Sequence, residues 1–501
     1  MGKIVRNPEQ FSKKTYDLIV IGGGIYGIMI SMEAARRHFR CLLLEKGDFG
    51  GATTFNSLRI LHGGFRYLQS LDLHRFLESV NERRWFLRYL PELVIPLACL
   101  MPLYGKGMRR PSVLRVASGM NNVLSCGRNR GVFRDKHLPK GKVISAEETL
   151  RLAPGISAAG IKGGVLWYDA SMQDSQRIVV EILREACGTG AEVLNYMEAL
   201  ELITNRKKVL GVKAKDLETG RSYEYRARIV VNAAGPWCRE VARRFDRDVE
   251  GLFKGSLAWN VLLSKPAFSA CALAVSPKKN NGKTYFLVPW KGKVLAGTGH
   301  VPWEGTAEDP RPSPELLQDF LDDLNLAIPG LEATKQDILY LFSGLLPATV
   351  EGTSQLAVRE VIWKHSEHDG PEGLYSLSGV KFTTARKVAE KALNKIFGLP
   401  SRKNPFKPLT IRVPSSAISG PKGDNAFEAG HLLDSLGSIV RDESVVHLDD
   451  LVFRRTSLWE KPQVIRDLAP TLCSLFPWDP IRRNAEMARI IREIPKGEMN
   501  G

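Results

Sequence analysis

The sequence predicts an α/β protein. A Rossmann-like nucleotide-binding domain carries an inserted β-rich domain and is followed by a helical C-terminal domain. Three observations predict this. An apolar run near the N-terminus ends in a glycine-rich turn. Two apolar runs far downstream also end in glycine turns. The region after residue 400 has mainly helical patterns. With 501 residues and 44% apolar composition, the chain has enough core for two or three domains.

The first glycine-rich turn has the spacing Gly22-x-Gly24-x-x-Gly27 and directly follows an apolar run. In such a turn the first glycine makes the tight bend, and the second lets the backbone approach a pyrophosphate. The third lets the following helix pack close to the strand. A second apolar run, 41–44, ends at Glu45, where a carboxylate can hold a ribose hydroxyl. We therefore predict a dinucleotide-binding βαβ unit over about 16–46, because an ordinary glycine turn would not account for Glu45.

Two further strand-like runs end in glycine turns, at 233–235 and at 378–379. A plain NAD domain would complete its sheet within about 150 residues. The wide spacing favours a flavin-binding domain into which a substrate domain is inserted. We predict that residues 1–400 form this FAD-binding domain from segments of about 16–90, 150–250 and 340–400, with substrate-domain insertions at about 91–150 and 251–340, and that 401–501 form the helical C-terminal domain.

Local patterns predict the elements within these segments. Helical periodicity is present at 72–90, 175–190, 315–327 and 385–397. Residues 208–231 alternate like a hairpin that turns at 218–220, and 252–300 are rich in strand patterns.

The net charge of +17 is concentrated in residues 101–140, which hold nine Lys or Arg against one acid, Asp135. An anionic membrane surface, an anionic substrate or nucleic acid could each account for this excess. Nucleic acid is disfavoured because no known binding motif accompanies the charge. The mixture of basic and apolar residues at 109–115 favours docking at a membrane interface, with a solvated basic face as the alternative.

The seven cysteines contain no CxxC pair, which predicts reduced thiols and no metal site. The polar start of the chain shows no secretory signal, and no run of about 18 apolar residues occurs. We therefore expect a cytoplasmic protein, with peripheral contact at the cytoplasmic membrane face as the membrane alternative. His365 and His368 lie in a polar stretch that is predicted to be an exposed loop.

Several motifs occur in a fixed order between about 16 and 460. The most specific is Leu61-His62-Gly63-Gly64-Phe65-Arg66-Tyr67-Leu68. The others lie at 45–49, 232–237, 254–256, 288–298, 378–386 and 454–456. Together they resemble the FAD-dependent glycerol-3-phosphate dehydrogenase and oxidase family, within the D-amino acid oxidase-like flavoprotein superfamily.

The resemblance implies an FAD enzyme that oxidises a small anionic polyol phosphate similar to glycerol 3-phosphate and passes the electrons to a quinone or to oxygen. His62 would lie near the flavin ring, either as the base or as a hydrogen-bonding partner of the cofactor. Arg66, Arg359 and Lys381 would hold the anionic group, and Tyr67 would lie beside them. Lys381 could also stabilise the reduced flavin.

The predicted cofactor-binding residues fall on the three glycine turns and their neighbours. Gly379 and Val380 would offer backbone amides to the flavin edge, and Val193 would lie on the adenine side. The full set is Gly22, Gly24, Gly27, Glu45, Lys46, Thr53, Ser57, His62, Val193, Ala234, Gly235, Trp237, Gly379, Val380, Lys381, Phe382 and Thr383.

The sequence departs from the family pattern at the substrate site. Leu346 stands where the family has an arginine, His300 replaces an acid and Lys291 replaces a glutamate. Ala52 and Asn56 occupy positions that are usually Gly and Arg. Loss of a guanidinium removes a strong bidentate contact with phosphate. Two alternatives therefore stay open: an FAD-dependent amine, amino acid or hydroxy acid oxidase, and a flavin-binding protein without efficient turnover.

Overall fold

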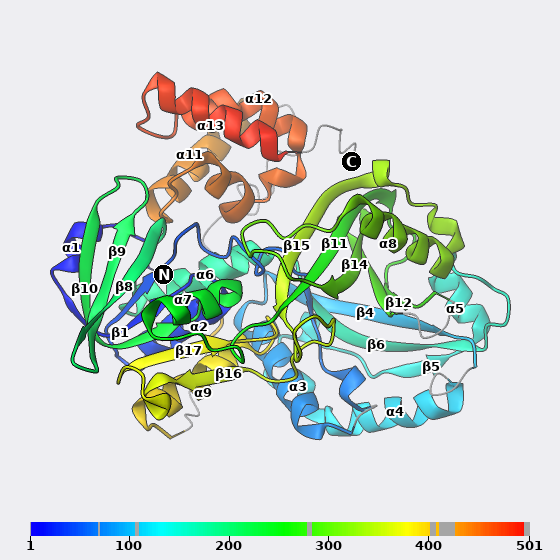
Figure 1. Cartoon of the computed structure of the whole chain (residues 1–501). Coiled ribbons are helices and arrows are strands. Elements are labelled where there is room, and N and C mark those ends of the chain that lie inside the picture. The colour runs from blue at the N-terminus through cyan, green and yellow to red at the C-terminus, as the bar shows by residue number, and fades with distance from the viewer. Residues whose placement is uncertain are drawn as a thin grey trace.

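The structure is a computed structural model that describes residues 2–68, 71–105, 110–277, 283–400, 407–409 and 426–494. Two large β-sheets lie side by side, and the C-terminal helices cover them at one end (Figure 1). This arrangement confirms the predicted α/β fold class and the helical C-terminal domain.

The first sheet joins the three segments that the glycine turns predicted. Its order is β16-β17-β10-β1-β2-β7. The bounds are Thr15–Ile21 for β1, Cys41–Leu44 for β2, Glu192–Leu194 for β7, Ser222–Asn232 for β10, Val361–Lys364 for β16 and Leu374–Ser378 for β17. Ile21 pairs with Asn232, and Asn232 pairs with Ser376, all in parallel strands. The carboxyl ends of β1, β10 and β17 therefore meet at one edge.

Helices cover this sheet on the face to which alternate residues of β1 point. Leu18 and Val20 pack into a core with α2 (Ile25–Arg36), α6 (Ser175–Gly188) and α9 (Ala385–Phe397). Ile19 and Ile21 face the opposite core, which contains residues of α1 (Pro8–Ser12) and α7 (Cys238–Phe245). Both faces of β1 are buried, which explains its continuous apolar sequence.

The hairpin predicted at 208–231 is also present. Strands β9 (Lys208–Asp216) and β10 pair antiparallel, and β8 (Met197–Asn205) extends the sheet beyond β9.

The second sheet has the order β15-β11-β14-β13-β12-β4-β6-β3, with β5 paired to β6. Its strands are β3 (Ile60–Leu61), β4 (Val94–Leu103), β5 (Lys142–Ile144), β6 (Gly163–Met172), β11 (Gly255–Pro266), β12 (Ala272–Val275), β13 (Tyr285–Trp290), β14 (Lys293–Pro302) and β15 (Ile338–Pro347). Strands β3 and β6 lie in segments assigned to the FAD-binding domain from the sequence, yet they pair in this second sheet. The reason is that β6 pairs along its whole length with β4.

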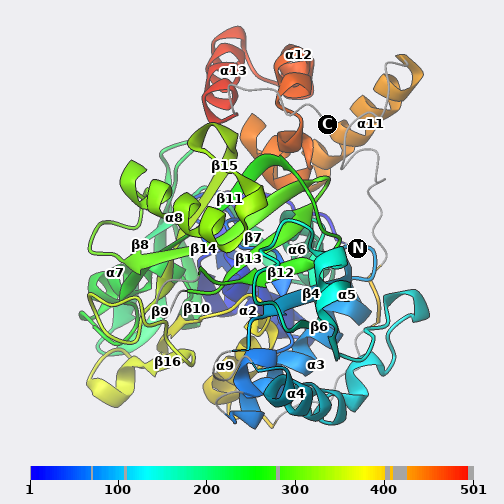
Figure 2. The ribbon, with the colours of Figure 1, turned by 90° about the vertical axis from the view of Figure 1, so that its right-hand side faces the viewer.

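Helices α3 (Leu73–Tyr89), α4 (Pro111–Leu124), α5 (Ala146–Leu152) and α8 (Pro314–Ala327) flank the second sheet. Figures 1 and 2 show α3 and α4 together at the end of the molecule opposite the C-terminal helices. The predicted helices at 72–90, 175–190, 315–327 and 385–397 are confirmed as α3, α6, α8 and α9.

The C-terminal domain contains α11 (Ala426–Asp442), α12 (Pro462–Cys473) and α13 (Pro480–Glu493). Between α11 and α12 run a π-helical turn, Asp450–Arg455, and a short 3-10 turn, Leu458–Glu460. Arg454 and Arg455 bond Asp48, in the loop after β2, and Trp459 packs on Phe342 of β15.

The prediction that 365–368 form an exposed loop was wrong for His365. That residue is fully buried and hydrogen-bonds Asp246 at 2.8 Å and Ser376 at 2.9 Å. Its partners come from the end of α7 and from β17, so the local sequence does not reveal them. His368 stacks on Trp363 instead.

Candidate active site

The glycine-rich turn after β1 has the geometry that its sequence predicts. Gly22 adopts φ +105°, and a Cβ there would lie 2.6 Å from the carbonyl oxygen of Ala233. A Cβ on Gly27 would lie 1.9 Å from the carbonyl oxygen of Gly22. Both positions therefore exclude a side chain, and α2 starts directly at the edge where the parallel strands end.

The N-terminus of α2 is built to receive an anion. Gly24 is the N-cap residue and makes no side-chain capping bond, while the hydroxyl of Thr54 accepts from the backbone N–H of Ile25 at 3.1 Å. Exposed N–H groups and the helix dipole favour a phosphate at this position. Sequence reasoning missed Thr54 and chose its neighbour Thr53, whose hydroxyl donates to the carbonyl of Leu345 at 3.1 Å.

Ser57, another predicted cofactor residue, lies in the same loop. Its hydroxyl is buried and has no hydrogen-bond partner among the described residues. A buried hydroxyl without a partner is uncommon in native structures and points to a ligand.

Glu45 closes the ribose end of the predicted cofactor site. One carboxylate oxygen accepts from the N–H of Gly23 at 2.5 Å, and the other accepts from Gly47 at 2.7 Å. Burial raises the pKa of this carboxyl above its usual value, while the two amides act in the opposite direction. Nearby, the ammonium of Lys46 lies 4.0 Å from the ring centre of Trp237.

Val193 and the second glycine turn lie at the same edge. The side chain of Val193 is buried in β7 beside Leu43, so a contact with adenine would come from its backbone. Ala234 precedes Gly235, which has φ +54° and begins the short turn Gly235–Trp237. Trp237 donates to Glu308 at 2.9 Å.

The third glycine turn is held by Tyr26, from the first turn of α2. The Tyr26 hydroxyl donates to the carbonyl of Lys381 at 2.7 Å and accepts from its N–H at 2.8 Å. A Cβ on Gly379 would lie 1.9 Å from the Tyr26 ring. After this turn, Phe382 packs against the apolar core and Thr383 is buried. Sequence reasoning did not identify Tyr26, because its partners are far away in the chain.

His62 is held by a carboxylate that sequence reasoning also missed. Its Nδ1 lies 3.1 Å from Oδ2 of Asp169 on β6, while its ring is about half exposed. The other oxygen of Asp169 accepts from the N–H of Gly63 at 2.7 Å and from Arg83 at 2.6 Å. A Cβ on Gly63 would lie 1.9 Å from Nη1 of Arg83, so this glycine makes room for the guanidinium.

Asp169 is charged, which fixes the tautomer of His62. Burial alone would raise the pKa of Asp169, but the hydrogen bond from His62 and the charge of Arg83 hold it at about 2. Because a carboxylate only accepts hydrogen bonds, Nδ1 of His62 carries the proton and Nε2 is left as an acceptor. The charged residue in the otherwise apolar run 163–172 is the signal in the sequence that could have revealed Asp169.

The predicted substrate cations gather beside the third glycine turn. A pocket of about 300 Å³ is lined by Arg359 and Lys381 and by Arg75 of α3. Burial and the nearby charge of Arg66 lower the pKa of Lys381 to about 8. The ammonium of Lys381 contacts the hydroxyl of Tyr67 and lies 4.2 Å from the centre of its ring. His62 is not among the residues that line this pocket in the described part of the chain.

Two positions that depart from the family pattern, Leu346 and His300, lie on β15 and β14, and both strands pair with β11. Leu346 pairs with Ser256 across the sheet, and the Ser256 hydroxyl lies 2.5 Å from Nε2 of His300. Burial and the charge of Lys283 lower the pKa of His300 to about 4, so this imidazole is neutral at pH 7. Lys291 forms an ion pair with Glu460 of the C-terminal domain. Neither position 346 nor position 300 therefore carries a cation at neutral pH.

Two other departures lie in the loop before His62. The Asn56 side chain donates to the carbonyl of Ala52 at 3.2 Å, and the Asn56 carbonyl accepts from Asn260 at 2.8 Å. Asn56 therefore joins this loop to β11.

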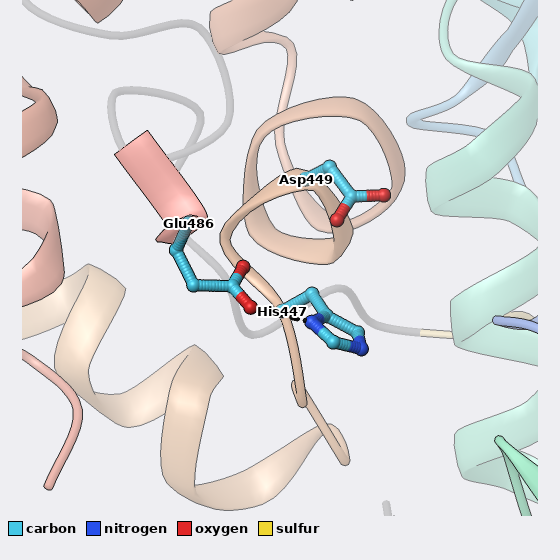
Figure 3. A group of neighbouring side chains, drawn as sticks. All are labelled: His447, Asp449 and Glu486. Atoms are coloured by element: carbon cyan, nitrogen blue, oxygen red, sulfur yellow. Dashed lines mark hydrogen bonds and ion pairs between the residues drawn. The ribbon is translucent and has the colours of Figure 1, made fainter. Parts of the chain in front are cut away.

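A cluster of His447, Asp449 and Glu486 has ligand atoms within 4.8 Å of one another (Figure 3). These atoms already have protein partners. His447 bonds Glu486 at 2.7 Å and Glu218 at 2.9 Å, and Asp449 pairs with Arg454 at 2.5 Å. The cluster is an ion-pair network between the C-terminal domain and the rest of the chain.

Comparison with known families agrees with this geometry. The model of the FAD dependent oxidoreductase family matches residues 17–390, and the chain belongs to this family. FAD fits the site described here, since the turn at Gly22, the helix N-terminus at Gly24 and the carboxylate of Glu45 suit its pyrophosphate and ribose. The predicted flavoenzyme class and cofactor are thereby confirmed.

Several members of this family are similar to the chain over most of its length. The chain is 28% identical to a glycerol-3-phosphate dehydrogenase of Synechocystis sp., with 98% of this chain and 89% of the relative covered. It is also 28% identical to an aerobic glycerol-3-phosphate dehydrogenase of Staphylococcus aureus, with coverage of 85% and 74%.

Solved structures support the same fold. The structure of the glycerol-3-phosphate dehydrogenase of Bacillus halodurans complexed with FAD aligns with a TM-score of 0.70 at 21% identity, covering 97% of this chain and 96% of that one. The L-alpha-glycerophosphate oxidase of Mycoplasma pneumoniae with FAD bound aligns with a TM-score of 0.57 at 15% identity, covering 79% and 99%.

Proposed function

We propose that this FAD-dependent oxidoreductase oxidises a small polyol phosphate of the glycerol 3-phosphate type. The observation that carries the proposal is the group of cations beside the third glycine turn, Arg66, Arg359 and Lys381. Bound FAD supplies the acceptor for the hydride. The names of the relatives from Synechocystis and Staphylococcus support the same substrate class.

In this proposal His62 is the base. Nε2 accepts the proton of the substrate hydroxyl, and the Nδ1–H donates to Asp169, whose charge stabilises the imidazolium that forms. Arg83 and the N–H of Gly63 keep the carboxylate in place. Tyr67 positions the Lys381 ammonium through contact with its hydroxyl.

The cations hold the phosphate. An arginine at position 346 would have offered a bidentate contact, but Leu346 cannot. Arg66 and Arg359 are both exposed and offer guanidinium donors, and Lys381 adds a third donor. The bound dianion would also favour the protonated form of Lys381, since an opposite charge raises the pKa of an ammonium.

The test is anaerobic reduction of the bound flavin, followed as loss of absorbance at about 450 nm. We expect glycerol 3-phosphate in excess to bleach the flavin rapidly, and glycerol, which lacks the phosphate, to bleach it far more slowly. Absence of bleaching by glycerol 3-phosphate, in a protein whose flavin is still reduced by dithionite, would contradict the proposed substrate.

Leu346 and the neutral His300 favour a second candidate function, oxidation of an amine, an amino acid or a hydroxy acid. A carboxylate needs only one arginine, which Arg66 or Arg359 could supply. In the same assay this function predicts bleaching by a carboxylate substrate and not by a sugar phosphate. Bleaching by neither class would favour the flavin-binding protein without turnover.

We also propose that the electrons pass to a quinone at an anionic membrane surface. The exposed face of α4 carries Val116, Met120 and Val123 beside Arg115, and Leu71, Leu73 and Leu77 are exposed around the start of α3. Arg109, part of the predicted docking run, lies outside the described residues. The first turns of α3 also supply Arg75 to the cation pocket, so this apolar and basic surface adjoins the proposed substrate site.

The contact would be peripheral. Among the described residues, the structure has no helix with the length and apolar character needed to cross a membrane. An interfacial helix such as α4 needs only an apolar stripe and flanking basic residues. Oxygen as the acceptor is the alternative, and it would not require this surface.

A further inference from the structure

We propose that the helical C-terminal domain controls FAD affinity, because two of its arginines clamp the loop 45–51 that presents Glu45 to the cofactor. This loop, called the ribose loop here, follows β2 and lies between the glycine-rich turn and the C-terminal domain. The inference concerns retention of the cofactor and is independent of which substrate the enzyme oxidises.

The ribose loop holds the centre of the glycine-rich turn through its backbone. Glu45 accepts from the N–H of Gly23 at 2.5 Å, and the N–H of Gly50 donates to the carbonyl of Gly23 at 2.9 Å. Both main-chain groups of Gly23 are therefore fixed by this one loop. A shift of the loop would therefore move two groups at once: the turn that receives the pyrophosphate and the carboxylate that receives the ribose.

The opposite side of the ribose loop is bound by the C-terminal domain. Asp48 is buried, and its two oxygens accept from Nη1 and Nη2 of Arg455 at 2.7 and 2.8 Å. Arg454 donates from Nε to the same carboxylate at 2.7 Å and lies over Gly51. Although burial opposes ionisation, the charges of Arg455 and Arg454 hold the pKa of Asp48 well below its usual range.

The two arginines are themselves fixed within the C-terminal domain. Arg454 also pairs with Asp449 and Asp450 at 2.5 Å each, and Arg455 donates from Nε to the carbonyl of Glu443 at 3.0 Å. Because Arg455 and the three aspartates are buried, their charges are satisfied only when the domain sits in this position. Displacement would leave uncompensated charges, which is strongly unfavourable.

A second ion-pair contact joins the same domain to the molecule without touching the ribose loop. Arg482 of α13 pairs with Glu218, in the turn between β9 and β10, at 2.9 Å. His447 bonds Glu218 as well, next to the cluster in Figure 3. Arg482→Gln therefore serves as a matched control, since it weakens docking of the domain but leaves Asp48, Arg454 and Arg455 in place.

The experiment measures FAD binding to the apoprotein by titration of flavin fluorescence in the full chain. The variants are Arg454→Gln, Asp48→Asn and the control Arg482→Gln. Since charge-assisted hydrogen bonds to a buried carboxylate are among the stronger ones, we expect Arg454→Gln and Asp48→Asn to weaken FAD binding by about tenfold or more. Arg482→Gln should remain within about threefold of the unmodified protein.

The variants avoid Arg455, because truncation of that fully buried side chain endangers folding. Arg454 is partly accessible, and Asn at position 48 keeps the side-chain volume. Far-ultraviolet circular dichroism and the thermal melting of each apoprotein report whether it is folded. FAD binding unchanged in folded Arg454→Gln and Asp48→Asn would overturn the proposal. Equal weakening by Arg482→Gln would also overturn it, since the effect would then come from general docking.

Discussion

His62 has a defined hydrogen-bonding role because its neighbours leave it no other arrangement. Asp169 is charged, and it accepts hydrogen bonds from His62, Gly63, Arg83 and Trp167. The bond to Asp169 therefore occupies Nδ1, and Nε2 is the nitrogen that would accept the proton of a substrate hydroxyl in the proposed mechanism. A role as base thus depends on a carboxylate that is more than a hundred positions away in the sequence.

We predict that Asp169→Asn slows flavin reduction by about 10²-fold or more while FAD remains bound. The amide of asparagine can donate to Nδ1, which would place the ring proton on Nε2 and remove the acceptor. The measurement is the anaerobic rate of flavin reduction at saturating substrate in a stopped-flow instrument. Asp135→Asn, at an exposed carboxylate, is the matched control. A rate within about threefold of the unmodified enzyme would exclude this role of Asp169.

Single residues differed in how far the sequence could reveal them. Gly22 and Gly27 could be predicted because the reasons for glycine are local: a positive φ and the close approach of one turn to the next. Tyr26, Thr54 and Asp169 could not, because each acts on a residue from another segment. The family resemblance supplied Arg66, Arg359 and Lys381, and the structure brings these near one another.

Helix α4 and the start of α3 expose more large apolar side chains than is usual for a face in contact with water alone. Val116 is 65% exposed and Val123 is 72% exposed on α4, and the exposed Arg115 directly precedes Val116 in the chain. Exposed valines near basic residues suit an anionic interface, because apolar burial and charge attraction then act together.

We predict that the protein binds vesicles of phosphatidylglycerol and phosphatidylcholine, and that added salt weakens this binding. Val116→Glu combined with Val123→Glu should weaken it by about tenfold or more, since both apolar contacts are lost and two negative charges are added. Ile481→Glu is the matched control, because Ile481 is 82% exposed but lies on α13, at the opposite end of the molecule (Figure 1). Sedimentation with vesicles gives the bound fraction. Equal binding by the α4 variant, or no binding by the unmodified protein, would leave α4 as a solvated face.

Elements were predictable where their pattern is local. Helices α6 and α9 have clear apolar faces, and their predicted bounds agree with the structure within a few residues. Strand pairing was harder to predict, because an apolar strand such as β6 does not show which sheet it joins. Its antiparallel partner β4 decides this, and that pairing is fixed by tertiary packing.

At the scale of the whole molecule, His447 contributes a pH-dependent contact between the C-terminal domain and the β9–β10 turn. Burial would lower the pKa of His447, but its bonds to Glu218 and Glu486, together with the charge of Asp450, raise it to about 9. The charge of Arg489 opposes this rise in part, and Arg482 also lies beside the ring. Its usual pKa is 6.5, so the imidazolium in the folded protein binds its proton more tightly than in the unfolded chain.

Such a group stabilises the fold fully below about pH 6.5, and this contribution is lost as the pH rises through about 9. We predict that His447→Gln lowers the free energy of unfolding at pH 6 by at most about 3 kcal/mol and flattens its decline between pH 6.5 and 9. Urea unfolding at several pH values measures both effects, with the exposed His137→Gln as the control. An unchanged pH profile would show that His447 is not the group that titrates.

The pairing of β1, β10 and β17 also has a consequence for biosynthesis. The FAD edge needs residues 374–378 beside 222–232, and the ribose loop is also bound by Arg454 and Arg455 of the C-terminal domain. During translation the glycine-rich turn emerges early and β10 follows before the middle of the chain, but β17 and the two arginines emerge much later. The nascent chain therefore cannot acquire a complete FAD site until almost the whole protein has left the ribosome. Until then β10 lacks its parallel neighbour β17, and this unpaired strand edge is the kind of surface that chaperones shield from aggregation.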